Sequence, residues 1–375
     1  MISKEIHSDN PESYFDKSTT NIIKGIALIF MFIHHMFTFP DAYIDGISYP
    51  ALEPYAKWLC TPFNMCVAIF AFLTGYCYFF CKEKNCHYAF RKITDVLITY
   101  WFVYIPFLVI ALFLGNYNDF SLKSFALELF ALNRPIMVFC WYIPFYIISM
   151  LVLTFAAKYS QKNLIGLIIF MLILPVMCPV ILAKFVGNSV IAGNLENVSE
   201  WFPCIGIGYI CASCSLFKRF DKLMNLFRYK WIKLIVYIVL GSGVFLARHY
   251  LAKVTLFTIY LLGRAVSVSI FMDVVYTPIF VYSIINIIRM IPIKKFWNLI
   301  GEIGKYSLYM WFLHCIFFNV SKNIFQPILY WPKNPILVIL WGLLLCYVAA
   351  RLIDIPLKRL LINKNNILGK LGHSV

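Results

Sequence analysis

Charged residues are scarce in this 375-residue chain: Asp, Glu, Lys and Arg make up 13% of it, whereas 62% of the residues are hydrophobic. A soluble domain has roughly 45–50% apolar and about 25% charged residues. A water-facing surface cannot be built from so few polar side chains, which excludes a soluble enzyme. The composition indicates a chain covered by lipid, in which each helical span needs roughly 20 apolar residues.

Acidic residues are the scarcer of the two charged classes, with 17 Asp and Glu against 33 Lys and Arg and a net charge of +16. In a soluble protein this excess would suggest nucleic acid as the partner. In a multi-span protein the cations instead gather in cytoplasmic loops and set the orientation. We therefore expect the lipid bilayer, and no nucleic acid, as a partner.

Several motifs are missing. The first 20 residues have no basic segment followed by an apolar run, so we predict no cleavable signal peptide. No HExxH, GxSxG or Gly-rich phosphate loop occurs, which gives common hydrolase and nucleotide-binding mechanisms no support. Most of the 12 Cys lie inside apolar runs and are typical of small buried residues. Cys211 and Cys214 have no second pair at zinc spacing, and we predict no metal site.

Long apolar runs recur along the chain and predict helices, since a membrane barrel would show short alternating segments. We place ten spans near residues 21–39, 59–81, 94–115, 136–157, 164–183, 201–217, 232–248, 267–289, 304–321 and 334–352. The stretch 255–273 is apolar but interrupted by Arg264. It is compatible with an eleventh span, a re-entrant piece or an interfacial helix.

The loop charges favour ten spans with both termini in the cytoplasm, because the inner loops then hold more than twice as many Lys and Arg residues as the outer ones. The predicted fold is an all-α, polytopic bundle of about ten transmembrane helices in the cell membrane. Residues 1–20 form a polar cytoplasmic tail, 21–360 the membrane domain and 361–375 a cytoplasmic C-terminal tail.

The first span carries Lys24, His34 and His35. Ionisable side chains within a span are costly and usually face a bundle interior or an aqueous cavity. Eleven positions at 100° each place His35 about 20° from Lys24 on the helix, about 16 Å away, whereas His34 lies about 80° off. Lys24 and His35 thus share a stripe. An imidazole near the midplane suits general-base chemistry, and a lysine below it suits an anion; hydrogen-bonded core histidines are the structural alternative.

Other stretches follow this Lys-x10-His pattern in a fixed order: residues 70–78 (FAFLTGYCY), 141–144 (WYIP), 201–208 (WFPCIGIG), 303–314 (IGKYSLYMWFLH) and 354–359 (DIPLKR). Together they resemble acyltransferase family 3, the integral-membrane O-acyltransferases. Thr74 replaces the Ser that is usual in the family. The resemblance covers roughly residues 20 to 360.

The resemblance implies an acyl-CoA donor, usually acetyl-CoA, and an acceptor hydroxyl on a cell-envelope carbohydrate or similar molecule. His35 would be the base that deprotonates the acceptor, or would relay the acyl group, and Lys24 would orient the site or meet CoA phosphate. Family members commonly have an Arg-x-Arg pair before the third span. This chain has Arg91 and Lys92 followed by Thr94 and Asp95; the resemblance assigns CoA contact to Arg91 first and to Lys92 second.

Five further residues are candidates with a structural alternative. His34 is a second polar group in the first span, and His314 is either catalytic or packed among aromatic neighbours. Ser307 is either a hydroxyl relay or helix-packing glue. Trp141 and Tyr142 either stack on a sugar or anchor the chain at the membrane interface, and their enrichment there favours the anchor.

A transporter or exporter of polysaccharide or its precursor is the alternative function. Broken helices near the midplane are typical of transporters, and Pro175, Pro179 and the 241–243 segment (GSG) provide possible breaks. A carrier needs no general base, whereas acyl transfer to a hydroxyl does. Lys24 and His35 therefore favour the O-acyltransferase.

Overall fold

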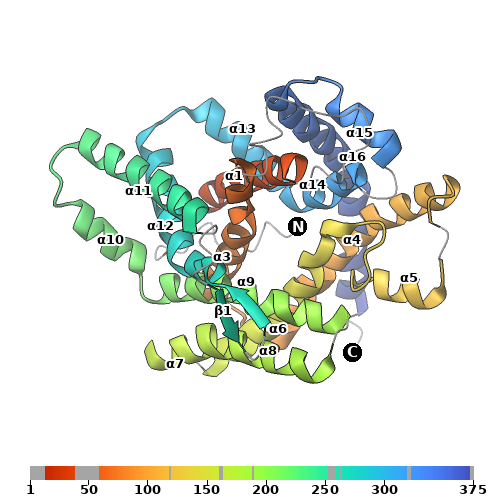
Figure 1. The fold of residues 1–375 in the computed structure, drawn as a ribbon, viewed down its shortest axis with the longest axis horizontal. Coiled ribbons are helices and arrows are strands. Elements are labelled where there is room, and N and C mark those ends of the chain that lie inside the picture. The colour runs from red at the N-terminus through yellow and green to blue at the C-terminus, as the bar shows by residue number, and fades with distance from the viewer. Residues whose placement is uncertain are drawn as a thin grey trace.

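The computed structural model describes residues 13–38, 59–117, 120–159, 164–187, 190–251, 258–261, 264–318 and 322–371. Most of these residues are helical and form one bundle, with α1 and α3 near its middle (Figure 1). The first half contains α1 (Lys17–Phe37), η2 (Thr61–Asn64), α3 (Met65–Phe79), α4 (Cys86–Phe113), α5 (Leu122–Glu128), η3 (Val138–Trp141), α6 (Tyr142–Tyr159), α7 (Leu164–Ile168), the π-helical η4 (Ile169–Ile173) and α8 (Leu174–Val186).

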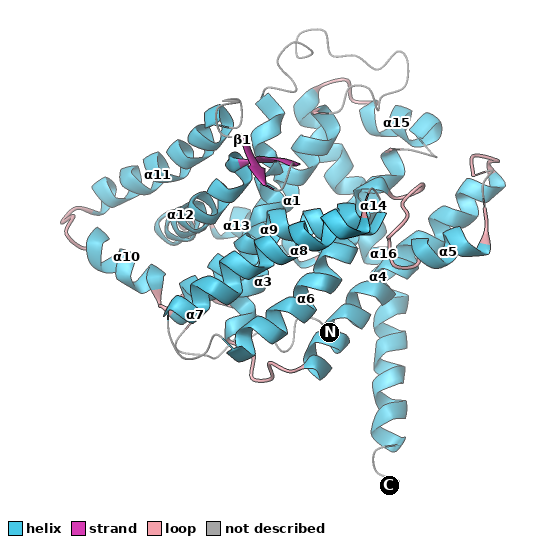
Figure 2. Ribbon diagram, turned by 60° about the horizontal axis from the view of Figure 1, so that its bottom comes forward, coloured by secondary structure: helices cyan, strands magenta, loops and turns pink. Residues whose placement is uncertain are grey.

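The second half contains α9 (Val190–Ser213), α10 (Leu216–Met224), α11 (Lys230–Leu251), β1 (Thr258–Leu261), β2 (Arg264–Ser267), α12 (Val268–Met290), α13 (Lys294–Lys305), α14 (Ser307–Leu313), η6 (His314–Phe317), α15 (Lys322–Tyr330) and α16 (Pro335–Leu371). The predicted C-terminal tail begins inside α16, which continues as a helix to Leu371 and extends away from the bundle (Figure 2). Likewise α1 begins at Lys17, inside the predicted N-terminal tail, of which residues 1–12 lie outside the described ranges.

Eight helices of the described residues are long and apolar enough to cross a membrane. A ninth span results if α9 and α10, which meet at an angle of 67°, are counted together. The helical membrane fold is confirmed, whereas the predicted number of ten is not. The main difference is the predicted span 304–321, where the apolar helix covers only Ser307–Phe317. The last four residues of this stretch, His314–Phe317, form a 3-10 turn.

The ambiguous stretch 255–273 holds an antiparallel hairpin in its described part, with β1 paired to β2 from Thr258↔Ser267 to Leu261↔Arg264. Each strand has only four residues. In β1 three of them, Thr258, Ile259 and Tyr260, are β-branched or aromatic and favour extended backbone, whereas β2 has only Val266 of this kind. Helix α12 follows directly at Val268. The hairpin differs from all three conformations considered for this stretch.

Glycines allow the central helices to approach closely. A Cβ atom on Gly75 of α3 would lie 1.8 Å from the carbonyl oxygen of Ile205 in α9. A Cβ atom on Gly304 of α13 would lie 1.8 Å from the carbonyl oxygen of Asn21 in α1. Small residues at such crossings are typical of membrane bundles, where close van der Waals packing replaces the hydrophobic effect. The second crossing fixes α13 and the start of α14 beside α1.

A buried ion pair links α11 to α12. The Arg248 guanidinium donates from Nε to Oδ1 of Asp273 at 2.7 Å and from Nη2 to Oδ2 at 2.9 Å. A third hydrogen bond runs from Nη1 to the carbonyl oxygen of Pro62 at 3.2 Å. Asp273 has no exposed surface. The pair is therefore bidentate, neutral overall and enclosed.

The segment before α1 is held by a polar cluster. The Tyr14 hydroxyl donates to Asp221 Oδ1 at 2.7 Å, and the Tyr282 hydroxyl donates to the same oxygen at 2.8 Å. Arg289 donates to the Tyr14 carbonyl and lies 4.3 Å from the Tyr14 ring centroid. Burial raises the pKa of the Tyr14 hydroxyl, and the hydrogen bond to Asp221 raises it further, so the hydroxyl keeps its proton and remains a donor.

Candidate active site

A cavity of about 300 Å³ lies between α1, α3, α4, α6, the end of α13, α14 and the middle of α16. This volume is at the lower end of the range for small-molecule sites. Most of its wall is apolar or aromatic. The charged side chains that line it are Lys17, Lys24, Lys92, Lys305 and Asp354.

The cavity therefore has four ammonium groups and one carboxylate. Lys92 lies 4.0 Å from Asp95, and Lys305 lies 3.4 Å from Glu302. Among the described residues, neither Lys17 nor Lys24 is within ion-pair distance of a carboxylate. An enclosed excess of positive charge is stabilised when an anion enters it. The wall thus has the charge expected of a site for an anionic ligand.

Of the two residues in the predicted stripe on α1, Lys24 lines the cavity and His35 does not. Lys24 faces the cavity together with Lys17, Thr20 and Asn21 of the same helix. Helix α1 begins at Lys17, because the Asp16 side chain caps it by accepting a hydrogen bond from the backbone N–H of Thr19 at 2.8 Å. The lysines therefore stand at the end of the cavity where the chain enters α1.

Of the two cations assigned to CoA, the structure brings Lys92 and not Arg91 to the cavity wall. Arg91 lies beside the Tyr88 ring, with its guanidinium carbon 5.5 Å from the ring centroid. The Lys92 ammonium lies 5.4 Å from the same centroid. Adjacent positions of a helix point about 100° apart, so one of the two had to face elsewhere. The resemblance favours Arg91 for CoA contact, whereas the geometry places Lys92, and not Arg91, on the cavity wall.

His35 and His314 form a buried pair. Nδ1 of His35 lies 2.8 Å from Nε2 of His314, and the two ring planes differ by 13°. Nδ1 of His314 is hydrogen-bonded to the backbone carbonyl of Trp311. The Phe139 ring stacks on His35 with centroids 4.0 Å apart and lies 5.5 Å from His314. Thus the first-span and late-motif histidines, 279 residues apart, meet in one site.

Trp311 connects this pair to the cavity. Its side chain lines the cavity and its carbonyl binds His314. The indole packs against Tyr142 and Phe70, with ring centroids 5.0 and 5.3 Å away. Neither histidine lines the cavity. Trp311, Tyr142 and Phe70 do line it, and we call these three rings the aromatic wall of the cavity.

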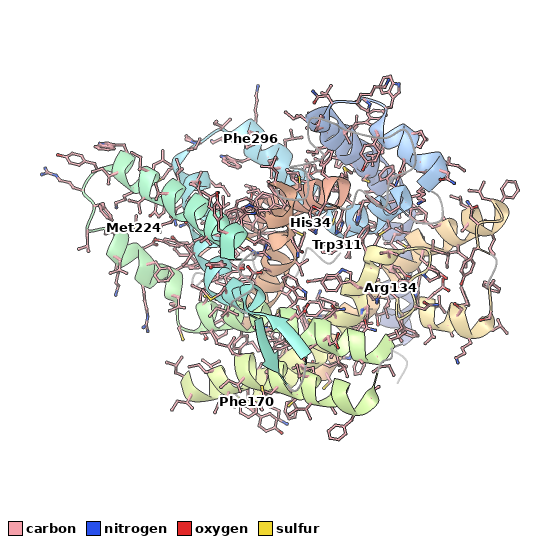
Figure 3. The ribbon with its side chains drawn as sticks, in the orientation of Figure 1. His34, Arg134, Phe170, Met224, Phe296 and Trp311 are labelled. Carbon is pink, nitrogen blue, oxygen red and sulfur yellow. The ribbon has the colours of Figure 1, made fainter. Side chains whose placement is uncertain are left out.

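The histidine region is central in the molecule. In Figure 3 the labels of His34 and Trp311 lie near the middle of the bundle, whereas those of Phe170, Met224 and Phe296 lie at its rim. His34 does not join the pair: its Nδ1 lies 3.2 Å from the carbonyl oxygen of Cys60 and 3.2 Å from the hydroxyl oxygen of Thr38. The two adjacent histidines therefore differ in environment, as their positions on the helix predict.

The remaining predicted residues divide into two groups. Tyr142 and Ser307 line the cavity. Trp141 is outside its wall and packs against Trp201, with ring centroids 6.3 Å apart. Trp141 therefore has the position of a packing residue, and Tyr142 that of a residue able to touch a ligand.

Sequence reasoning missed four parts of this site. Lys17 falls in the predicted N-terminal tail, Lys305 lies in the 303–314 motif without drawing attention as a cation, and Phe139 precedes the motif that contains Trp141. The Tyr309 hydroxyl donates to Asp354 at 3.1 Å, and both line the cavity. The available signals were the 303–314 motif, which contains Lys305 and Tyr309, and the 354–359 motif, which Asp354 opens.

The described residues contain no group of three or more His, Cys, Asp or Glu side chains arranged to hold a metal ion. What the site does contain is a cavity with an aromatic wall and an excess of ammonium groups, and a histidine pair that is hydrogen-bonded to the backbone of Trp311 in that wall. A multi-pass helix bundle with these parts can bind an anionic donor and offer a buried base.

The comparison with protein families agrees with this class. A family model described as an acyltransferase domain matches residues 19–354. The chain belongs to this family, acyltransferase family 3, and is a multi-pass membrane acyltransferase. Comparisons with curated proteins and with solved structures gave no significant match.

Proposed function

We propose that the protein transfers an acyl group, most simply acetyl, from acyl-CoA to a hydroxyl of a cell-envelope polysaccharide or related carbohydrate, with His35 as the general base. The supporting observation is that Lys24 and its neighbouring lysines line the same cavity as Trp311, whose carbonyl is bound to His314, the hydrogen-bond partner of His35. The positive-inside charge distribution supports a cytoplasmic entrance on the lysine side.

The donor would enter with its phosphates toward the lysines. Lys17, Lys24, Lys92 and Lys305 line the same cavity, and a phosphate accepts strong charge-assisted hydrogen bonds from ammonium groups. The cavity would hold part of the donor, with the thioester directed to Trp311. Since Lys24 and His35 share a stripe separated by about 16 Å, the acyl group has to pass the aromatic wall before it meets the base.

The reaction conserves atoms and charge. His35 takes the proton from the acceptor hydroxyl, and the oxygen attacks the thioester carbonyl carbon. The new C–O bond forms, the C–S bond breaks, and the thiolate leaves with the proton that His35 returns to it. The products are the O-acylated acceptor and free CoA. No metal is needed for this step.

The test is transfer from radiolabelled acetyl-CoA to envelope polysaccharide by the purified protein in lipid nanodiscs, with CoA release measured in parallel. We expect label and CoA to appear in equal amounts with the wild type and to disappear with His35→Ala. His34→Ala is the matched control, because it removes a buried histidine one residue away and should have a milder effect. If folded wild-type protein released no CoA with any of several hydroxyl acceptors, the proposal would be wrong and an exporter would be favoured.

A further inference from the structure

We infer that His314 is a positioning residue: it holds His35 in the form that carries its proton on Nδ1, so that Nε2 of His35 is the atom that accepts the proton. This inference rests on the proposed function for its catalytic meaning. The geometry behind it is a hydrogen-bonded chain from the Trp311 carbonyl through His314 to His35.

The direction of the chain is set at its first link. A backbone carbonyl oxygen has no proton to give, so it can only accept. Nδ1 of His314, which is bonded to the Trp311 carbonyl, must therefore carry the hydrogen. In a neutral imidazole only one ring nitrogen is protonated. Nε2 of His314 then carries a lone pair and is a hydrogen-bond acceptor.

The second link follows from the first. Nε2 of His314 and Nδ1 of His35 are 2.8 Å apart, a distance at which two lone pairs would repel. Because Nε2 of His314 accepts, Nδ1 of His35 donates. The neutral His35 ring therefore has its own lone pair on Nε2. The pair thus selects one tautomer of His35 and with it the identity of the basic atom.

The burial of His314 supports its neutral form. Its side chain has no exposed surface, and among the described residues no carboxylate forms an ion pair with it. A buried charge without a counter-ion is strongly disfavoured. The neutral ring also serves the reaction: when His35 takes up a proton on Nε2, its Nδ1–H remains bonded to His314, which stabilises the imidazolium through a neutral acceptor.

Phe139 keeps the two rings in this arrangement. It stacks on His35 at 4.0 Å with an interplanar angle of 16° and lies over His314 at an angle of 23°. Its own carbonyl accepts from Nε1 of Trp311 at 3.3 Å. A ring flip of His35 would have to displace this stacked ring. The orientation of the base is therefore fixed by packing as well as by the hydrogen bond, as in sites where outer partners fix the tautomer of a histidine.

Two substitutions separate positioning from packing. His314→Gln keeps an acceptor, because the Gln carbonyl oxygen reaches the position of the histidine Nε2. His314→Leu fills similar space without an acceptor. We expect His314→Leu to lower kcat by on the order of 10²–10⁴-fold, the range typical when a histidine base loses the group that fixes its tautomer. The KM for acyl-CoA should change little, and His314→Gln should restore most of kcat.

A direct readout is the ¹⁵N spectrum of the full-length protein in nanodiscs with labelled histidine, with His35→Gln used to assign the His35 signals. We expect a protonated Nδ1 and an unprotonated Nε2 in the wild type, the same pattern in His314→Gln, and a shift of the proton toward Nε2 in His314→Leu.

A wild-type His35 protonated on Nε2 would overturn the inference, and so would full kcat in His314→Leu. The spectrum reports the tautomer even if no acyl transfer is found, so failure of the proposed function would be seen separately. If His314→Leu does not fold, the wild-type spectrum and His314→Gln still decide the question.

Discussion

Arg248 and Asp273 form a closed ion pair inside the bundle, whereas Lys24 faces a cavity with no carboxylate at ion-pair distance among the described residues. The pair joins two helices and its charges cancel. The lysine shares its cavity with three other ammonium groups and one carboxylate. Charge that is neutralised within the protein contributes to the structure, while charge left in excess around a cavity is available to a ligand. Four substitutions test this distinction between structural and ligand-binding charges.

The largest effect should come from opening the ion pair. Asp273→Ala leaves the Arg248 guanidinium buried without a counter-ion, which typically costs about 3–5 kcal/mol. SDS-induced unfolding in mixed micelles would measure the loss. The double variant Arg248→Met/Asp273→Leu should recover most of the stability, because apolar replacement of both partners is often neutral. A single variant as stable as the wild type would show that the pair is not structural.

Lys24→Met should affect ligand binding more than folding. Losing a hydrogen bond to a charged group costs roughly 1.5–3 kcal/mol, which corresponds to about a 10- to 100-fold rise in the KM for acyl-CoA. Initial rates against acyl-CoA concentration would measure it, with SDS unfolding of the same sample as the control. A destabilisation as large as that of Asp273→Ala would mean that Lys24 is a structural charge.

Gly304→Ala should disturb the cavity by changing the packing of α13 against α1. The added Cβ would meet the Asn21 carbonyl oxygen at 1.8 Å, so α13 would have to move from α1 and carry Lys305 with it. Overpacking of this kind costs about 1–3 kcal/mol. Gly243→Ala is the matched control, because nothing lies within 4 Å of its new Cβ. Thermal unfolding that is equal in both variants would contradict the close crossing.

The smallest effect is expected for Lys17→Met. Lys17 lies in the first turn of α1 and is only partly buried, and exposed charges contribute roughly 0.2–1 kcal/mol. This energy corresponds to about a 1.4- to 5-fold rise in KM. Added salt should reduce the effect further. A loss in KM equal to that of Lys24→Met, or one that does not respond to salt, would show that both lysines contact the ligand equally.

Periodicity and spacing predicted most of the fold and one side of the site. The helical bundle and the separation of His34 from His35 follow from the helical repeat and apolar runs, whereas the shared stripe of Lys24 and His35 stays a prediction. The contact between His35 and His314 could not be derived, because 279 residues separate them and only packing brings them together. The same holds for Arg248 and Asp273. The hairpin at 258–267 was missed because its apolar residues also suit a helix, and length alone did not decide between the two.

The cluster around Tyr14 has a consequence for the order of assembly during synthesis. Tyr14 is bonded to Asp221, which follows 207 residues later, and its carbonyl accepts from Arg289, 275 residues later. Contacts this distant in sequence can form only after the intervening helices have been made and inserted. The start of the first helix, from which the lysine side of the cavity is built, therefore reaches its final place only after α12 has joined the bundle. In this protein α1 precedes these partners in the chain and is among the last helices to be locked in place.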